Sequence, residues 1–269
     1  PYHIGTCEVT AEQYTTFLND VAGSDPYGLW SQDLAAAAGI AREGDAGTYS
    51  YAVPNDWARR PVCEVSWGDA ARFANWLQTG TTEHGAYELG GATDAQDLMA
   101  VQRQADWQWA IPTEDEWYKA AYYNPDAGTY YIYPTASDAY PSNQLVDPDP
   151  GDNVTIGENP ESYTIGRPYW RTEVGAHENS PSPYGTFDQG GNVGEWLETV
   201  ITGFRSLRGG SYRPADLAWC GSVHAQDRVP EMPDMEAPTV GFRLVQAPEP
   251  AALALLAAGG LALLRRRRR

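Results

Sequence analysis

The chain has 269 residues, of which 42% are hydrophobic and 12% aromatic, so it can fold around a core of its own and is not a disordered protein. Its formal net charge is −18 although it ends in a run of five arginines, and so acidic a body repels nucleic acid. The acidity is typical of a protein solvated in a salty or extracellular medium, with cation binding as the alternative. The 27 glycines and 20 prolines predict many turns and loops.

Three segments predict core helices, because each opens with a hydroxyl residue that is followed three positions later by an acid or amide able to cap it reciprocally. These pairs are Thr10 with Gln13, Ser66 with Asp69, and Thr113 with Glu116. Apolar residues at helical spacing define the buried face of each helix. The residues expected to face inward are Tyr14, Phe17, Leu18 and Val21 in the first, Ala70, Phe73 and Leu77 in the second, and Trp117, Ala120 and Ala121 in the third.

Between these helices, residues 23–51 and 80–97 are rich in turn formers, and residues 107–111 predict a strand that leads into the third helix. Residues 122–184 have no sustained periodicity, and loops of that length usually carry a function or an ion. No linker divides the body. We therefore expect one mixed domain.

The cysteines and histidines are few and scattered, which limits the metal and redox chemistry available. There is no Cys-x-x-Cys pair for zinc or a dithiol centre, and at most one disulfide can form. No two histidines have the spacing that would place them on one helical face, so a histidine-based iron site is unsupported. The residues are Cys7, Cys63 and Cys220, and His3, His84, His177 and His224.

The last 23 residues differ in composition from everything before them. Residues 247–250 read Ala-Pro-Glu-Pro, an apolar run covers 251–264, and the arginines follow. Fourteen residues in a helix span about 21 Å, which is short of a hydrocarbon core of ~30 Å, so this run predicts transient membrane anchoring with the arginines on the cytoplasmic side. Because export also needs a signal peptide and the chain starts at Pro1, we expect its N-terminus to be incomplete.

The order of Pro-Glu-Pro, apolar run and arginine cluster resembles the PEP-CTERM sorting signal of exopolysaccharide-producing bacteria, with an ordinary tail anchor as the alternative. The resemblance implies that a sorting protease of the exosortase type cleaves the tail. It further implies that the mature protein lies at the cell surface or outside the cell.

Several blocks of the body resemble the formylglycine-generating-enzyme (sulfatase-modifying-factor) family, in the family's order and over residues 2 to about 245. The third and fourth blocks match its Leu-Pro-Thr-Glu-x-Glu-Trp and Gly-Gly-Asn-Val-Trp-Glu-Trp motifs, with Gly194 in place of the Trp. The resemblance implies an α+β domain related to C-type lectins, with little regular secondary structure, at residues 1–246, followed by the hydrophobic tail at 247–269. The blocks are Ile4-Gly5-Thr6-Cys7-Glu8-Val9-Thr10, Pro61-Val62-Cys63-Glu64-Val65-Ser66-Trp67, Ile111-Pro112-Thr113-Glu114-Asp115-Glu116-Trp117, Gly190-Gly191-Asn192-Val193-Gly194-Glu195-Trp196, Leu207-Arg208-Gly209-Gly210-Ser211-Tyr212 and Gly241-Phe242-Arg243.

Family oxidases bind copper(I) between two thiolates that follow the Gly-Gly-Ser motif, and copper(I) prefers sulfur ligands. Counting from that motif puts Pro214 at the first cysteine position, and counting back from Gly241 puts Cys220 at the second. The resemblance thus implies Cys220 and Ser211 as catalytic candidates. It argues against formylglycine formation, because a proline cannot ligate copper. The alternatives are that Cys220 is a buried apolar residue and that Ser211 satisfies backbone groups.

The turn around the Gly-Gly-Asn motif offers two carboxylates and two backbone carbonyls to a hard cation. The resemblance implies calcium in this turn and a second calcium ion near Asn153 and Val154. The alternative is that the acids cap turns. The ligands expected for the first ion, at positions 1, 4, 6 and 8 of the turn, are Asp188, Gly191, Val193 and Glu195.

The tail, the missing cysteine at position 214 and the aromatic loops favour an exported, calcium-braced, non-catalytic binding or surface protein whose ligand is a glycan or another matrix component. The alternative is a formylglycine-generating-type oxidase, or another protein-modifying enzyme with altered metal chemistry at Cys220. A structural surface protein without a ligand is a third hypothesis. The aromatic candidates, for which ordinary packing is the alternative, are Tyr130, Tyr131, Tyr133, Tyr169 and Trp170.

Overall fold

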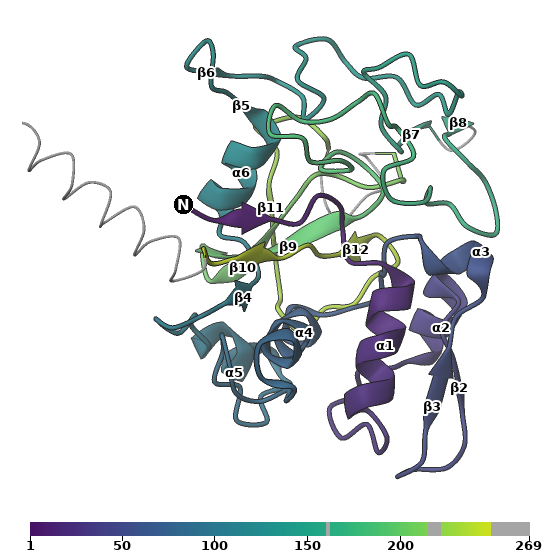
Figure 1. The fold of residues 1–269 in the computed structure, drawn as a ribbon, viewed down its shortest axis with the longest axis vertical. Coiled ribbons are helices and arrows are strands. Elements are labelled where there is room, and N and C mark those ends of the chain that lie inside the picture. The colour runs from purple at the N-terminus through teal and green to yellow at the C-terminus, as the bar shows by residue number, and fades with distance from the viewer. Residues whose placement is uncertain (160–161, 215–221, 249–269) are drawn as a thin grey trace, which may run out of the picture.

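A computed structural model describes residues 1–159, 162–214 and 222–248 (Figure 1). The helices are α1 (Ala11–Val21), α2 (Gln32–Ala38), α3 (Asn55–Ala58), α4 (Trp67–Thr79), α5 (Ala95–Ala100) and α6 (Glu114–Tyr122). The strands are β1 (His3–Ile4), β2 (Ala41–Glu43), β3 (Ser50–Ala52), β4 (Trp109–Ala110), β5 (Tyr123–Asn124), β6 (Thr129–Tyr130), β7 (Gly157–Asn159), β8 (Ser162–Tyr163), β9 (Gly194–Ile201), β10 (Phe204–Arg208), β11 (Val229–Glu231), β12 (Val240–Gly241) and β13 (Val245–Gln246). About a fifth of the chain is helical and about a fifth is in strands, which confirms the α+β domain with little regular structure.

The three predicted helices, α1, α4 and α6, begin at the expected residues, and each carries the complete capping box. In α1, the Thr10 hydroxyl accepts a hydrogen bond from the Gln13 N–H at 3.3 Å, while the Gln13 side chain accepts one from the Thr10 N–H at 2.9 Å. Such pairs satisfy two backbone donors that a helix start otherwise leaves free. The capping-box pattern in the sequence therefore predicted the first residues of these three helices correctly.

Two further helices were not predicted: α2 lies within the turn-rich segment 23–51, and α5 begins at the end of the turn-rich segment 80–97. Each is short and has one of the two hydrogen bonds of a capping box. The Ser31 side chain accepts a hydrogen bond from the Leu34 N–H, and the Asp94 side chain accepts one from the Asp97 N–H. The expected strand at 107–111 is reduced to the two residues of β4. The prediction that Leu77 faces inward was wrong, because its side chain is 39% exposed at the edge of α4.

The central sheet has the order β11-β10-β9-β12, with β12 parallel to β9 and the other pairs antiparallel. A three-stranded sheet, β1-β13-β4, pairs the first strand of the chain with the last described one, with His3 opposite Gln246. Figure 1 shows α1, α2, α4 and α5 on one side of the central strands, and α6 with the long loops on the other.

Strand β9 separates two apolar clusters because its side chains alternate between the faces of the sheet. Trp196 packs into the large cluster with α1 and α4, and its indole N–H donates to the Val65 carbonyl at 2.9 Å. Leu197 packs on the opposite side with Trp117 of α6. Glu195 and Leu197 are two positions apart in β9, so their side chains lie on the same face of the sheet. The Glu195 carboxylate therefore lies on the α6 side.

Candidate functional site

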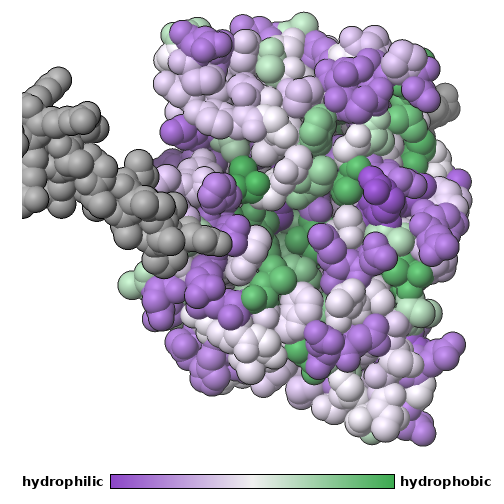
Figure 2. Space-filling model, viewed as in Figure 1, coloured by the Kyte–Doolittle hydropathy of each residue, from purple (hydrophilic) through white to green (hydrophobic). Residues whose placement is uncertain are grey.

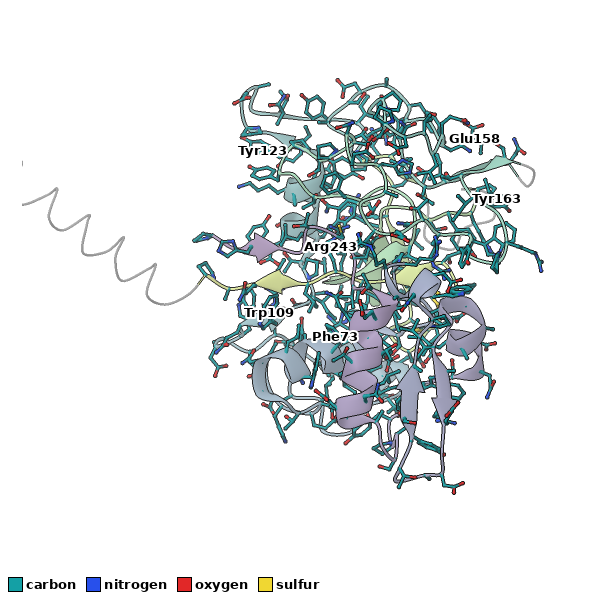
Figure 3. The ribbon with its side chains drawn as sticks, turned by 45° about the vertical axis from the view of Figure 1, so that its right-hand side comes forward. Phe73, Trp109, Tyr123, Glu158, Tyr163 and Arg243 are labelled. Atoms are coloured by element: carbon teal, nitrogen blue, oxygen red, sulfur yellow. The ribbon has the colours of Figure 1, made fainter. Side chains whose placement is uncertain are left out.

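A buried ion pair joins β9 to the segment that follows β12. The Arg243 guanidinium donates from Nε to Oε2 of Glu195 at 2.6 Å and from Nη2 to Oε1 at 2.7 Å, and both side chains are fully buried. The Trp117 indole N–H also donates to Oε2 of Glu195, at 2.8 Å. The other Arg243 donors reach the carbonyls of Gly5, Thr6 and Phe187. Arg243 therefore ties the N-terminal segment to the Gly-Gly-Asn turn (Figure 3).

The Gly-Gly-Asn turn depends on left-handed backbone at three positions: Asp188 with φ 59°, Gly191 with φ 86° and Asn192 with φ 52°. At Gly191 a side chain is also sterically excluded, because a Cβ there would lie 2.2 Å from the Thr155 carbonyl oxygen. This close approach brings the turn against the segment that contains Asn153 and Val154, which carry the second predicted cation site.

At the first predicted calcium site, Asp188 fits a cation better than Glu195 does. Burial raises the pKa of the Asp188 carboxyl to about 6, and the nearby Glu195 carboxylate adds to the rise. On Glu195, Oε2 already accepts two hydrogen bonds and Oε1 accepts one, so only Oε1 retains acceptor capacity. Within the described ranges no group of three or more His, Cys, Asp or Glu side chains is placed to hold a metal ion, so a cation here would rely on backbone carbonyls.

At the second predicted site, Asn153 is buried and its amide N–H donates to Asp149 at 2.6 Å and to the Gly151 carbonyl at 3.1 Å. Its Oδ1 atom has no hydrogen-bond partner among the described residues. The Val154 carbonyl accepts a hydrogen bond from the Thr164 hydroxyl at 3.3 Å. An unpartnered buried oxygen costs about 1–3 kcal/mol, so Oδ1 of Asn153 is an oxygen donor that remains available to a hard cation.

Sequence reasoning missed Asp149, whose carboxylate organises the second site. It accepts hydrogen bonds from Asn153, from Ser180 at 2.8 Å, and from the backbone N–H groups of Gly151 and Asn179. Burial alone would raise the pKa of Asp149, but these hydrogen bonds outweigh burial and lower it. The acidic Asp-Pro-Asp-Pro-Gly-Asp run before Asn153 was the available signal.

The predicted catalytic region surrounds Ser211, which is buried and accepts a hydrogen bond from the Arg213 N–H at 3.2 Å. Pro214 packs against β7 so closely that a Cβ on Gly157 would lie 2.7 Å from its Cδ atom. The cavity beside Ser211, lined also by Tyr140 and Gly210, has a volume of about 20 Å³, which is room for only one water molecule. Ser211 thus has the backbone-satisfying contact that was its alternative interpretation.

No thiolate pair is found near Ser211 in the part of the chain that the structure describes. Cys220 lies outside the described residues. Cys63 is fully buried, as expected for a small apolar residue, and burial raises the pKa of its thiol to about 11. Cys7 is only half-buried and lines a cavity, and burial raises the pKa of its thiol to about 12. Both thiols are therefore protonated at neutral pH, which makes them poor copper(I) ligands.

Three aromatic residues, Tyr163, Trp170 and Tyr212, form a ladder that begins at Tyr212, the residue after Ser211. The rings of Tyr163 and Trp170 meet edge to face with centroids 4.9 Å apart, and Trp170 stacks on Tyr212 at 6.1 Å. The Arg171 and Arg213 guanidinium groups lie 5.8 Å and 5.9 Å from the Tyr212 ring. Tyr163 and Trp170 are partly exposed, and the Arg167 guanidinium group lies 5.7 Å from the centre of the Trp170 ring. Sequence reasoning singled out Trp170 but missed both partners.

The other predicted aromatic candidates do not join this ladder. Tyr130 is 52% exposed and packs on Tyr118 and Tyr123 at the hairpin β5–β6. Tyr133 contacts Tyr140 and His224. The remaining two, Tyr131 and Tyr169, are bonded through their hydroxyl groups to Asn124 and Asp56 respectively.

Two models of known protein families match the chain. A model described as "Sulfatase-modifying factor enzyme 1-like domain" matches residues 1–248. The chain belongs to the sulfatase-modifying-factor family. A second model, the "PEP-CTERM protein-sorting motif", matches residues 246–269, so this family member carries a signal for export and sorting to the cell envelope by exosortase-type machinery. No curated protein matches the chain by sequence.

Solved structures share the fold of this sulfatase-modifying-factor domain at low sequence identity. The crystal structure of CarF is 23% identical with a TM-score of 0.58, covering 93% of this chain and 87% of that chain. Treponema denticola variable protein 1 is 22% identical with a TM-score of 0.56, covering 92% and 84%. PvdO from Pseudomonas aeruginosa is 16% identical with a TM-score of 0.51, covering 92% and 81%. At such identities the likeness concerns the fold alone.

The predicted membrane anchor at 251–264 lies outside the described residues. Among the helices of the described ranges, none has the length and apolar character needed to cross a bilayer. The last described strand, β13, is held between β1 and β4, and the Ala247 N–H donates to the Gln108 carbonyl at 2.9 Å. The folded sulfatase-modifying-factor domain therefore continues into the first residues that match the sorting motif.

Proposed function

We propose that this exported sulfatase-modifying-factor domain is a calcium-braced binding protein and not a formylglycine-forming oxidase. The observation that carries the proposal is Pro214, which stands where the resemblance expects the first copper-ligating cysteine and packs against Gly157. A proline offers copper(I) no ligand atom. The donor set described around Ser211 does not fit copper.

The aromatic ladder supports a glycan or matrix ligand. Sugars present apolar C–H faces that pack on aromatic rings, while their hydroxyl groups bond to polar neighbours. Trp170 has a φ of 60°, a left-handed conformation that is rare for a bulky residue, and its N–H donates to the Gly166 carbonyl at 3.1 Å. Such a fixed ring loses little conformational entropy when a ligand stacks on it.

Calcium would be held by carboxylate, amide and backbone carbonyl oxygens. The unpartnered Oδ1 of Asn153 and the half-buried carboxylate of Asp188 support this part of the proposal. Val154, Gly191 and Val193 would contribute carbonyl oxygens. A bound ion would brace the loops from which the aromatic ladder projects.

The test begins with a glycan array probed with the body, which we define as residues 1–248. The best polysaccharide is then titrated calorimetrically against Trp170→Ala and against Tyr130→Ala, an exposed aromatic on a different hairpin. We expect Trp170→Ala to weaken binding at least 10-fold, because one stacked ring typically contributes about 1–3 kcal/mol, and Tyr130→Ala to leave it unchanged. Equal loss in both variants, or no saturable binder, contradicts the ladder as the binding site.

The alternative function is an oxidase or another protein-modifying enzyme that uses Cys220. A peptide-conversion assay with copper(I), oxygen and a cysteine-containing sulfatase-type peptide, read by mass spectrometry, separates the two functions. We expect no conversion under conditions in which a two-cysteine relative is active. Conversion that disappears in Cys220→Ala would overturn the proposal in favour of the enzyme.

A further inference from the structure

A large apolar groove lies between α1, α4 and the chain segment that joins β1 to α1. Its volume is about 530 Å³, and Figure 2 shows apolar residues gathered in the hollowed middle of the face that carries α1. Its lining shares no residue with the Ser211 cavity, so it is a separate feature. We name it the α4 groove, and the apolar side chains that define it are Val9, Phe73, Trp76, Leu77, Trp109 and Leu244.

The wall of the α4 groove leaves apolar surface uncovered. Phe73 and Trp76 of α4 pack with their ring centres 5.4 Å apart, and Figure 3 shows Phe73 and Trp109 below Arg243. Trp76 and Trp109 are partly exposed, and Leu77 is 39% exposed. Leu77 therefore faces an apolar wall that is open to solvent. On soluble proteins, such hollowed apolar surfaces mark contact sites.

The chain leaves the body beside this groove. Gln246 of β13 pairs with Trp109 of β4, which lines the groove. An extended chain covers at most about 3.6 Å per residue, so the apolar run at 251–264 begins within about 18 Å of Gln246. So short a tether gives an attached segment an effective concentration in the mM range. The run is therefore the apolar segment of this chain that reaches the groove most readily.

The composition of the tail matches the groove and its edge. The run at 251–264 contains only alanine, leucine and glycine, which suit an aromatic and aliphatic wall, and five arginines follow it. Helix α1, on the other side of the groove, has no basic residue and carries two exposed carboxylates, those of Glu12 and Asp20. Asp20 accepts a hydrogen bond from the Trp76 indole N–H at 3.2 Å, so it stands at the edge of the groove. The arginines thus have carboxylates to meet.

We propose that, in the uncleaved chain outside a bilayer, the apolar run docks in the α4 groove of its own body while the arginines lie beside the carboxylates of α1. Docking removes the run and the groove wall from water until the run enters a membrane. Once the tail is removed, the groove is uncovered, so the mature protein differs from its precursor at this surface. The proposal uses neither the calcium sites nor the aromatic ladder and is independent of them.

The first test measures the oligomeric state of the full chain and of the body in detergent-free buffer, by size-exclusion chromatography with light scattering. We expect both to be monomers, because the docked run is shielded. Leu77→Arg places a charge of the same sign as the arginines on the groove wall, so the full-length variant should expose its tail and self-associate. The matched control is Leu145→Arg, at a leucine that is 47% exposed outside the groove, and its full-length form should stay monomeric.

The body with Leu77→Arg separates release of the tail from misfolding. The family model matches the body in full, so the body is expected to fold without the tail, and this variant should remain a monomer with the circular dichroism of the parent body. A parent full chain that self-associates would overturn the proposal. So would a full-length Leu77→Arg variant that is as monomeric as the parent.

A disulfide cross-link locates the run. Leu256→Cys is combined with Leu77→Cys or, as the control, with Leu145→Cys, in full chains whose Cys7 and Cys220 are replaced by serine. After oxidation in dilute solution, mass spectrometry of peptides should show at least a threefold higher intramolecular yield for the pair at 77 and 256 than for the control pair. Equal yields would overturn the proposal. Disulfides between two chains would make a second copy the occupant and would overturn it as well.

The same cross-link tests the contact between the arginines and α1. Glu12→Gln combined with Asp20→Asn should lower the yield for the pair at 77 and 256 at least twofold at low ionic strength, and less at high ionic strength, because salt screens exposed charges. Asp126→Asn, at an exposed position between β5 and β6, should leave the yield unchanged. A yield that is insensitive to the α1 substitutions would contradict the charge contact.

Discussion

The Arg243 side chain binds Glu195 bidentately, at 2.6 Å and 2.7 Å, in the fully buried centre of the body. The two residues are 48 positions apart in the chain, and Arg243 also reaches the carbonyl of Gly5, 238 positions away. Every guanidinium N–H is used, so the buried charge is fully compensated. This pair connects the N-terminal segment, the Gly-Gly-Asn turn and the end of the body.

Breaking this pair should strongly destabilise the body. Glu195→Gln leaves Arg243 as a buried, incompletely paired charge, so the free energy of unfolding should fall by about 3–5 kcal/mol in urea denaturation. The matched control is Arg59→Gln, which removes an ion pair to Glu173 whose side chains are 66% and 47% exposed, and should cost less than about 1 kcal/mol. Similar losses in the two variants would show that the buried pair has no special role.

Alanine substitutions at Gly191 and Gly203 distinguish the cost of a steric clash from the cost of backbone strain. Their φ angles are 86° and 87°, but a Cβ at Gly191 would meet the Thr155 carbonyl at 2.2 Å, whereas nothing lies within 4 Å of one at Gly203. Gly203→Ala should cost about 1–2 kcal/mol of strain, and Gly191→Ala should cost clearly more, with a lower yield of folded protein. Thermal unfolding followed by circular dichroism compares them. Equal melting temperatures would mean that the turn can move away from Thr155.

Glu64 should make stability depend on pH. Burial, followed by the charge of Asp33, raises the pKa of Glu64 to about 7. A carboxyl group with a raised folded pKa holds its proton longer in the folded state, so its contribution to stability falls as the pH rises from about 4.5 to about 7. Glu64→Gln should thus raise the melting temperature at pH 8 by about 2–4 °C, equivalent to about 1 kcal/mol after allowance for partial exposure, with little effect at pH 4.5.

The control for this pH dependence is Glu43→Gln, at an exposed position of β2. Glu43→Gln should have the same difference in melting temperature between pH 4.5 and pH 8 as the parent protein. A Glu64→Gln variant that is stabilised equally at pH 4.5 and pH 8 would attribute the gain to packing and not to ionisation.

The proposed calcium sites predict a calcium-dependent melting temperature. A ligand present at about 100 times its Kd stabilises the folded state by about 2.7 kcal/mol, which corresponds to about 5–10 °C for a domain of this size. Asn153→Ala and Asp188→Ala should each reduce this shift, because each removes one proposed ligand. Asp126→Ala, at an exposed position between β5 and β6, should preserve it. An identical melting temperature in EGTA and in calcium chloride would rule out both sites.

Local signals in the sequence predicted the helix starts, since a capping box involves residues only three positions apart. The pairs at Thr10, Ser66 and Thr113 are all formed as expected. The short helices α2 and α5 escaped prediction because a one-sided cap such as that of Ser31 or Asp94 also occurs in turns. The ordered blocks of motifs indicated the family, and the composition of the last residues indicated the sorting signal.

By itself, then, the sequence determined the family, the sorting tail, the three capped helices and the absence of a cysteine at position 214. Only the tertiary structure decided that Arg243 pairs with Glu195, that Tyr163 and Tyr212 flank Trp170, and that Glu8 is buried beside Asp188. The physical reason is how far apart in the chain the interacting residues lie. Caps and sorting signals act between neighbouring residues, whereas ion pairs, stacked rings and cavities depend on distant segments that meet only when the chain has folded.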